Sequence, residues 1–139
     1  MKHLTKLCVG ILLFLTLSKQ AKANDTSIFS NLQYPKIAIC IHRLETGNGT
    51  SKLYKKYNNM FGFKVNSRKL HNGKTKSNYA KYESRSASLM DYYLFEKQLI
   101  KRFGIKNQKQ YIAVISKRYA RNPSYGKLLR KQLKSCIRK

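Results

Sequence analysis

Apolar side chains recur at helical spacing in four stretches of the chain, which begin near Pro35, Ser88, Asn107 and Pro123. Residues three and four positions apart lie on one face of a helix, so each stretch predicts an amphipathic helix. Serine, asparagine and proline are typical residues at the first turn or cap of a helix. We therefore expect a mainly helical chain.

The first of these helices is expected to end at the segment Thr46-Gly47-Asn48-Gly49, because glycine and asparagine adopt left-handed backbone conformations at low cost. Glu45 consequently lies in the last turn of a mostly apolar helix, beside a glycine-rich loop. Two shorter helices are also expected, capped by Asp25 or Thr26 and by Thr50 or Ser51.

The segment from Phe63 to Ser84 interrupts the helical pattern. It is mostly polar and basic, and polar and apolar residues alternate over residues 79–82, as in a short strand. We expect a small β-hairpin or irregular lobe here, with a turn at His71-Asn72-Gly73. The predicted fold class is mainly α, of the α+β type: a helical domain, a small β-hairpin lobe and a cleft between them.

The first 23 residues have the features of a signal peptide. Lys2, His3 and Lys6 precede eleven apolar residues (LCVGILLFLTL), and Ala21-Lys22-Ala23 fits a cleavage site. The alternative, a membrane anchor, would need about 20 apolar residues to cross a bilayer as a helix. We therefore expect cleavage after Ala23, export to the periplasm or the exterior, and no stable membrane insertion afterwards. The mature chain, residues 24–139, is expected to form one domain.

The charge of the chain points to an anionic partner. The full chain has a formal charge of +25, and loss of the four lysines in the first 23 residues leaves +21 on 116 residues. Such a charge attracts anionic polymers through long-range electrostatics. The polymers of a cell wall and nucleic acid both fit, and export favours the cell wall, so no specific nucleic-acid partner is expected.

Two cysteines remain in the mature chain, Cys40 and Cys136. In an oxidising compartment they can form a disulfide, which would stabilise the fold by up to ~4–5 kcal/mol in the chain-entropy model. Two buried free thiols are the alternative. No spacing of cysteine and histidine resembles a zinc site, so neither a metal nor another cofactor is expected, and we expect a monomer.

Four motifs, in order along the chain, together resemble one enzyme family. Residues 44–49 (LETGNG) are similar to the catalytic Glu-Ser/Thr-Gly segment of glucosaminidase domains, glycoside hydrolase family 73. Residues 58–64 (NNMFGFK) resemble its Asn-Leu-Phe-Gly-Ile-Lys segment. Residues 79–92 contain its Tyr-x-x-Tyr-x-Ser and Ser-x-x-Asp-Tyr pattern, and residues 116–125 (SKRYARNPSY) resemble its C-terminal motif.

The resemblance implies a lysozyme-like fold and hydrolysis of the β-1,4 bond after N-acetylglucosamine in peptidoglycan, with Glu45 as general acid. Such an acid must keep its proton near neutral pH. The negative end of the helix dipole and an apolar environment both raise the pKa of Glu45. The positive charge of the chain opposes them, so the basic residues must lie away from Glu45 or be screened. The alternative is a solvated residue at a helix end.

A second catalytic carboxylate is harder to find in the sequence. Residues 64–82 contain no acidic residue, and Glu83 is the nearest candidate for a base or nucleophile, with a solvated turn residue as the alternative. Reactions that need one acid are the simpler hypothesis: the 2-acetamido group of the substrate attacks the anomeric carbon, or a polar side chain positions water. Asp91 and Glu96 are explained by capping and by surface salt links.

Three further residues are candidates for substrate binding. By resemblance, Tyr119 is the active-site tyrosine, which would contact Glu45, water or the acetamido group, unless it is a core residue bonded to the backbone. Asn59 is a candidate for binding an acetamido group, and Phe61 for stacking on a sugar ring or filling the core. We expect Tyr125 to serve packing, and the lysines and arginines to form a solvated surface that binds the cell wall.

Other functions also fit the sequence. A muramidase or a lytic transglycosylase would use a single glutamate on a related fold. A non-catalytic, cationic protein that binds the cell wall would explain the missing second acid. A secreted nucleic-acid binder would use the interleaved basic and tyrosine residues for phosphate contacts and base stacking.

Overall fold

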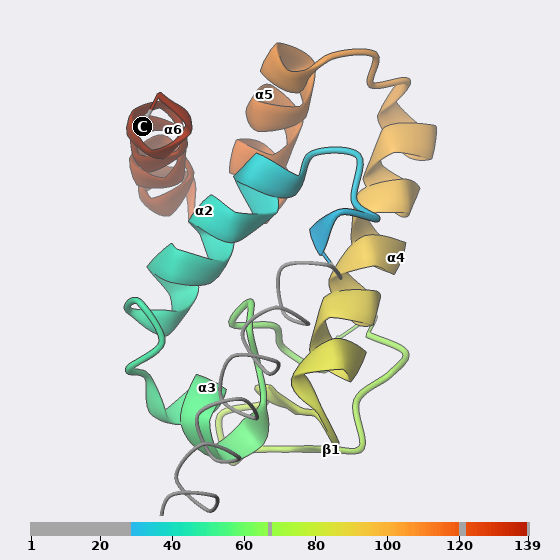
Figure 1. The fold of residues 1–139 in the computed structure, drawn as a ribbon, viewed down its shortest axis with the longest axis vertical. Coiled ribbons are helices and arrows are strands. Elements are labelled where there is room, and N and C mark those ends of the chain that lie inside the picture. Colours follow the sequence, from blue (N-terminus) through green and yellow to red (C-terminus); the bar gives the residue numbers. More distant parts are fainter. Residues whose placement is uncertain (1–28, 67, 120–121, 139) are drawn as a thin grey trace, which may run out of the picture.

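The computed structural model describes residues 29–66, 68–119 and 122–138 (Figure 1). The proposed signal peptide and the predicted helix cap at Asp25 or Thr26 lie outside these ranges. The elements, in chain order, are α2 (Pro35–Thr46), α3 (Lys52–Tyr57), β1 (Gly73–Lys74), β2 (Ala80–Lys81), α4 (Arg85–Phe103), α5 (Gln108–Arg118) and α6 (Pro123–Ile137).

The helix that carries Glu45 begins at Pro35 and ends at Thr46, the first residue of the segment that the sequence predicts to end it. Pro35 occupies its first turn, where the missing N–H of proline costs no hydrogen bond. Gly47 ends it in a left-handed conformation, with φ of 55°, and the N–H of Gly47 donates to the carbonyl oxygen of Leu44. The last turn of α2 is therefore defined by the local sequence.

The β lobe is present, but its turn lies later than predicted. Strand β1 pairs with β2 in antiparallel register, with Gly73 opposite Lys81 and Lys74 opposite Ala80. The chain turns between Thr75 and Asn78, and not at residues 71–73. Asn78 has a φ of 61°, which asparagine tolerates better than most residues, and its N–H donates to the carbonyl oxygen of Thr75.

The remaining helices follow the predicted pattern, with one change. Asn107 and Asn122 cap α5 and α6 as expected. In contrast, α4 begins three residues before the predicted start at Ser88, because Ser84 is its cap and accepts from the N–H of Ala87. Ser88 is buried instead, and its hydroxyl oxygen accepts from the N–H of Met60. This bond ties the loop after α3 to α4.

The helices surround a single core. In Figure 1, α2 crosses the molecule between α6 and α4, while α3 and the hairpin lie at the end opposite α5. Helix α6 contacts α2 and α5, α5 also contacts α4, and α3 contacts β2. The largest side chains that are fully buried are Tyr92, Tyr111, Phe61, Ile37, Ile41, Met60, Ile115, Leu129 and Leu133. Among the described helices, none combines the length and the apolar character needed to cross a membrane.

Asp91 and Glu96 are buried, which corrects the expectation of surface salt links. Glu96 accepts from the backbone N–H groups of Gln33 and Tyr34, at 2.8 and 3.1 Å, immediately before α2 begins. Asp91 accepts from the hydroxyl of Tyr82 at 2.9 Å. A buried carboxyl without such donors would be costly, so both acids act as anchors: Glu96 fixes the start of α2 on α4, and Asp91 fixes the β lobe on α4.

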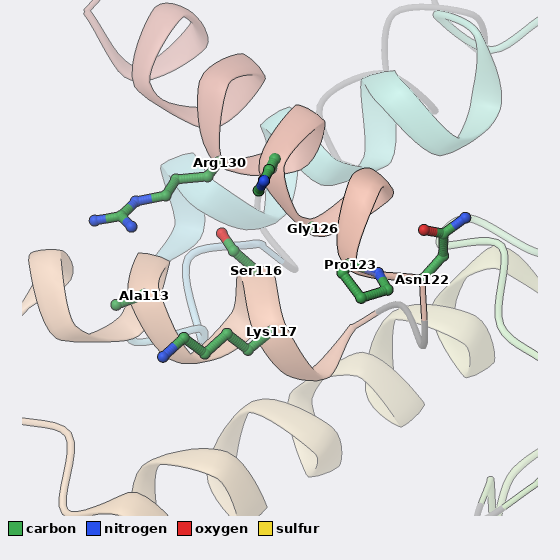
Figure 2. A pocket seen from close by; sticks show the side chains of 8 residues that line it. Ala113, Ser116, Lys117, Asn122, Pro123, Gly126 and Arg130 are labelled. Carbon is green, nitrogen blue, oxygen red and sulfur yellow. The ribbon is translucent and has the colours of Figure 1, made fainter.

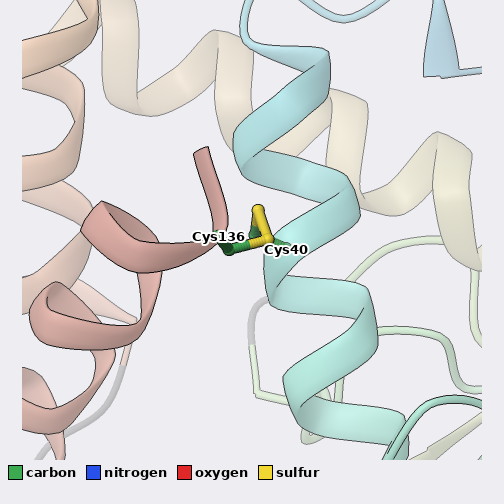
Figure 3. The surroundings of a disulfide bond; sticks show 2 residues. All are labelled: Cys40 and Cys136. Carbon is green, nitrogen blue, oxygen red and sulfur yellow. A yellow bond between two sulfur atoms is a disulfide. The ribbon is translucent and has the colours of Figure 1, made fainter. Parts of the chain in front are cut away.

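A disulfide joins Cys40 of α2 to Cys136 near the end of α6 (Figure 3). The two cysteines are 96 positions apart in sequence, and their Cα atoms lie 5.9 Å apart. Of the two alternatives that the sequence leaves open, a disulfide or two free thiols, the structure contains the disulfide. Because the closed loop includes most of the domain, the disulfide restricts the unfolded chain strongly.

Replacement of both cysteines by serine should lower the free energy of unfolding by about 2–5 kcal/mol. Denaturant unfolding of the wild type, with and without a reducing agent, measures the same effect. Reduction should bring the wild type close to the double serine variant and leave that variant unchanged. An unfolding midpoint of the wild type that is the same with and without the reducing agent would contradict the stabilising role of the disulfide.

Candidate active site

A cleft of about 810 Å³ opens beside the end of α2. Its wall combines five aromatic rings, three asparagines, three basic residues, one glycine and one carboxyl group. The lining residues are Glu45, Gly62, Phe63, Lys64, Asn66, Arg68, Asn78, Tyr79, Phe95, Arg118, Tyr119, Asn122 and Tyr125. They come from the helices as well as from the β lobe, so the cleft lies where the sequence predicts it, between the two.

Glu45 supplies the carboxyl group, and Tyr125 of α6 holds it. The hydroxyl of Tyr125 donates to Oε1 of Glu45, across 80 positions of sequence. Burial raises the pKa of Glu45 above its ordinary value of 4.5, and the hydrogen bond from Tyr125 opposes that shift only in part. The carboxyl group therefore keeps its proton to a higher pH than a free glutamate.

Tyr125 is a functional candidate that the sequence does not reveal. The sequence predicts a packing role for it, whereas the structure places it in the cleft wall as the hydrogen-bond partner of Glu45. Burial, and then the neighbouring Glu45, raise the pKa of the Tyr125 phenol, so this hydroxyl remains a donor at neutral pH. Its place in the first turn of α6 gives no local signal for the contact, which depends on how α6 packs on α2.

Gly62 lies directly against the other carboxyl oxygen of Glu45. A Cβ atom at this position would overlap Oε2, and the backbone has a φ of 62°, which favours glycine. The loop after α3 can therefore approach the carboxyl group only because residue 62 has no side chain. Tyr125 thus contacts one oxygen of Glu45, and Gly62 leaves room for the other.

Tyr119 lines the cleft, but its hydroxyl is not directed to Glu45. It donates to the carbonyl oxygen of Phe61, so the backbone satisfies it, while the ring lies 5.8 Å from Phe63 and 6.0 Å from Phe95. Burial raises the pKa of Tyr119 far above its ordinary value. The ring is thus part of an aromatic wall, and the hydroxyl holds the loop that contains Gly62.

Asn59 and Phe61 are buried and absent from the cleft wall: Phe61 fills the core, which is one of its two predicted roles, and the amide of Asn59 is bonded to the backbone. The amide nitrogen of Asn59 donates to the carbonyl oxygens of Phe63 and Ala80, each at 2.9 Å, and its oxygen accepts from the N–H of Phe63. Phe61 is fully buried and stacks on Tyr92 with ring centroids 4.2 Å apart. Both residues shape the loop that presents Gly62.

Glu83 does not join Glu45 in the cleft. Its side chain is exposed, the residue is absent from the cleft wall, and its carbonyl oxygen accepts from the side chain of Asn58. With Asp91 and Glu96 occupied as anchors, Glu45 is the only carboxyl among the described residues of the wall. The arrangement therefore suits chemistry that needs one acid.

A second, smaller cavity of about 270 Å³ lies between α5 and α6 (Figure 2). Gly126 lets the two helices approach closely, because a Cβ atom there would overlap the carbonyl oxygen of Ser116. Lys117 and Arg130 extend to the same side in this view. No acidic residue lines the cavity, and among the described residues no cluster of histidine, cysteine and acidic side chains could hold a metal.

Comparison with known proteins places the chain in context. Residues 23–137 match the model of the glucosaminidase family, described as mannosyl-glycoprotein endo-beta-N-acetylglucosaminidase. Among solved structures, the chain is similar to the catalytic domain of the autolysin Auto from Listeria monocytogenes. The identity is 26% and the TM-score 0.53, over 88% of this chain and 83% of that one. No curated protein matches the sequence. The expected fold class, lysozyme-like and mainly helical with a small β lobe, is confirmed.

Proposed function

Because the chain belongs to the glucosaminidase family of glycoside hydrolases, we propose that it hydrolyses peptidoglycan, at the β-1,4 bond after N-acetylglucosamine. The observation that carries this proposal is the half-buried carboxyl of Glu45 in a long cleft with aromatic and amide walls. Aromatic rings pack on sugar faces, and asparagine amides bind acetamido and hydroxyl groups. The cleft therefore suits an N-acetylated glycan strand.

In this proposal Glu45 is the general acid. Tyr125 donates to Oε1, so the proton of the neutral carboxyl resides on Oε2, the oxygen beside Gly62. Oε2 would deliver the proton to the glycosidic oxygen as the bond to the anomeric carbon breaks. Burial supports this role because it favours the protonated form.

The nucleophile in this proposal is the 2-acetamido group of the substrate. Its carbonyl oxygen attacks the anomeric carbon while Glu45 protonates the leaving oxygen, and water then opens the cyclic intermediate and returns a proton to Glu45. The single carboxyl among the described residues of the cleft supports this route, which belongs to the exceptions from the two-carboxylate scheme. Glu83 is the weaker candidate for a second group, because it is exposed and outside the wall.

We also propose that the protein acts outside the cytoplasm. The first 23 residues have the pattern of a cleaved signal peptide, and the remaining +21 charge suits a surface of anionic wall polymers. The disulfide between Cys40 and Cys136 agrees with an oxidising compartment. We expect the protein to work as a monomer without a cofactor.

Replacement of Glu45 by glutamine should reduce the cleavage of purified sacculi by roughly 10²–10⁴-fold, because the amide cannot donate the proton. The wild-type rate should fall as the pH rises through the pKa of Glu45, since the ionised carboxylate has no proton to give.

Mass analysis of the wild-type products should find reducing N-acetylglucosamine ends. Reducing N-acetylmuramic acid would indicate a muramidase, and 1,6-anhydromuramic ends would indicate a transglycosylase.

The stability of the Glu45→Gln variant separates loss of chemistry from loss of fold. A carboxyl whose pKa is raised by folding stabilises the protein in acid, and this contribution is lost as the pH rises through the raised pKa. The glutamine variant should therefore unfold at the same or a higher temperature than the wild type at neutral pH. An unchanged lytic rate in this folded variant would refute the assignment of Glu45.

Replacement of Gly62 by alanine should lower kcat/KM by roughly 10–100-fold, because a Cβ atom displaces the carboxyl that delivers the proton. Gly104→Ala is the matched control, since Gly104 has a similar φ of 59° but open space around a Cβ atom. Both variants should lose about 1–2 kcal/mol of stability from backbone strain. Equal activities of the two folded variants would contradict the positioning role of Gly62.

A further inference from the structure

We infer that Lys64, Arg68 and Arg118 form an anion subsite in the cleft, which binds carboxylate groups of the stem peptides carried by the glycan strand. The inference rests on the proposed function and names the part of the substrate that these residues recognise. All three line the same cleft as Glu45, and they come from two different parts of the fold, the loop before β1 and the end of α5.

Arg68 lies against two aromatic rings of the cleft wall and is less exposed than the other two cations. Its guanidinium lies 4.0 Å from the ring centroid of Phe63 and 4.5 Å from that of Phe95, and both rings line the cleft. Burial lowers the pKa of Arg68 from its ordinary value, and the negative charge of Asp91 opposes that shift. A planar guanidinium that lies against two aromatic rings is preorganised for a carboxylate.

Lys64 and Arg118 add charge at more exposed positions. The ammonium of Lys64 lies 5.4 Å from the ring centroid of Tyr79, and the guanidinium of Arg118 lies 5.1 Å from that of Phe103. Such contacts restrain the long side chains while leaving their polar groups in contact with water. Both residues can therefore meet a ligand without a large loss of hydration.

The balance of charge in the cleft favours an anionic ligand. Three basic residues face one carboxyl group, and the proposed reaction needs that carboxyl to be neutral. Positive charges within the same cleft favour its ionised form. A bound carboxylate offsets part of this charge and so adds to the protonated state of Glu45 that burial already favours.

Peptidoglycan supplies carboxylates in a regular pattern. Stem peptides are attached to every second sugar, so an anion subsite at a fixed place relative to Glu45 favours one of the two possible registers of the strand. The subsite thus offers a physical reason for a choice between the two glycosidic bonds. Phosphate polymers of the wall carry charge as well, but they are not part of the strand that lies along the cleft.

The test uses two preparations of the same glycan strands, freed of phosphate polymers: one native, and one with its peptide carboxylates converted to amides. The wild type should cleave the native strands with a kcat/KM roughly fivefold to tenfold higher than the amidated strands. The double variant Lys64→Gln/Arg118→Gln should bring this ratio close to one, mainly through a higher KM on native strands. Arg68 is left in place, because it packs against Phe63 and Phe95 and its removal would also disturb the aromatic wall of the cleft.

The double variant Lys101→Gln/Lys109→Gln is the matched control, since it removes the same charge from exposed positions of α4 and α5 outside the cleft wall. It should keep the wild-type ratio. Equal cleavage of native and amidated strands by the wild type would overturn the subsite, and so would an equal loss of the ratio in the control variant. A third preparation keeps its phosphate polymers. If the wild type prefers native over amidated strands only in that preparation, the subsite is overturned and the polymers account for the charge recognition. Failure to cleave either preparation would contradict the proposed function itself.

Discussion

The candidate site depends on one contact, the hydrogen bond between Glu45 at the end of α2 and Tyr125 at the start of α6. This contact forms only if α2 is correctly oriented and positioned relative to α6. Glu96 fixes the start of α2 through two backbone N–H groups, and the disulfide between Cys40 and Cys136 ties its middle to the far end of α6. The two helices are thus joined at both ends of α6, and the carboxyl group occupies the junction.

The same junction contains an electrostatic conflict. Proton donation needs a neutral carboxyl, yet the chain has a formal charge of +25 and places three basic residues in the cleft. Burial of Glu45 acts against these charges and raises its pKa. In contrast, the buried Asp91 accepts from a hydroxyl and favours the charge of Arg68, so the other acid of the region serves structure. Glu45 and Asp91 have different roles because their surroundings differ.

The sequence predicted the helix ends that are determined by neighbouring residues. Pro35 and Gly47 define the ends of α2, and asparagines cap α5 and α6, so those bounds and the place of Glu45 were predictable. The partner of Glu45 was not, because Tyr125 is 80 positions away and reaches it only through the packing of two helices. The burial of Asn59 was not predictable for the same reason: its side-chain amide bonds to the carbonyl oxygen of Ala80, 21 positions later in the chain.

The central claim is that folding raises the pKa of Glu45 and so keeps a proton in the cleft. The chain contains three glutamates, so protein labelled with ¹³C at the glutamate carboxyl groups gives few resonances, and the Glu45→Gln variant assigns the one that matters. A titration of that resonance by NMR should have its midpoint above the ordinary value of 4.5. A midpoint at or below 4.5 would contradict the account.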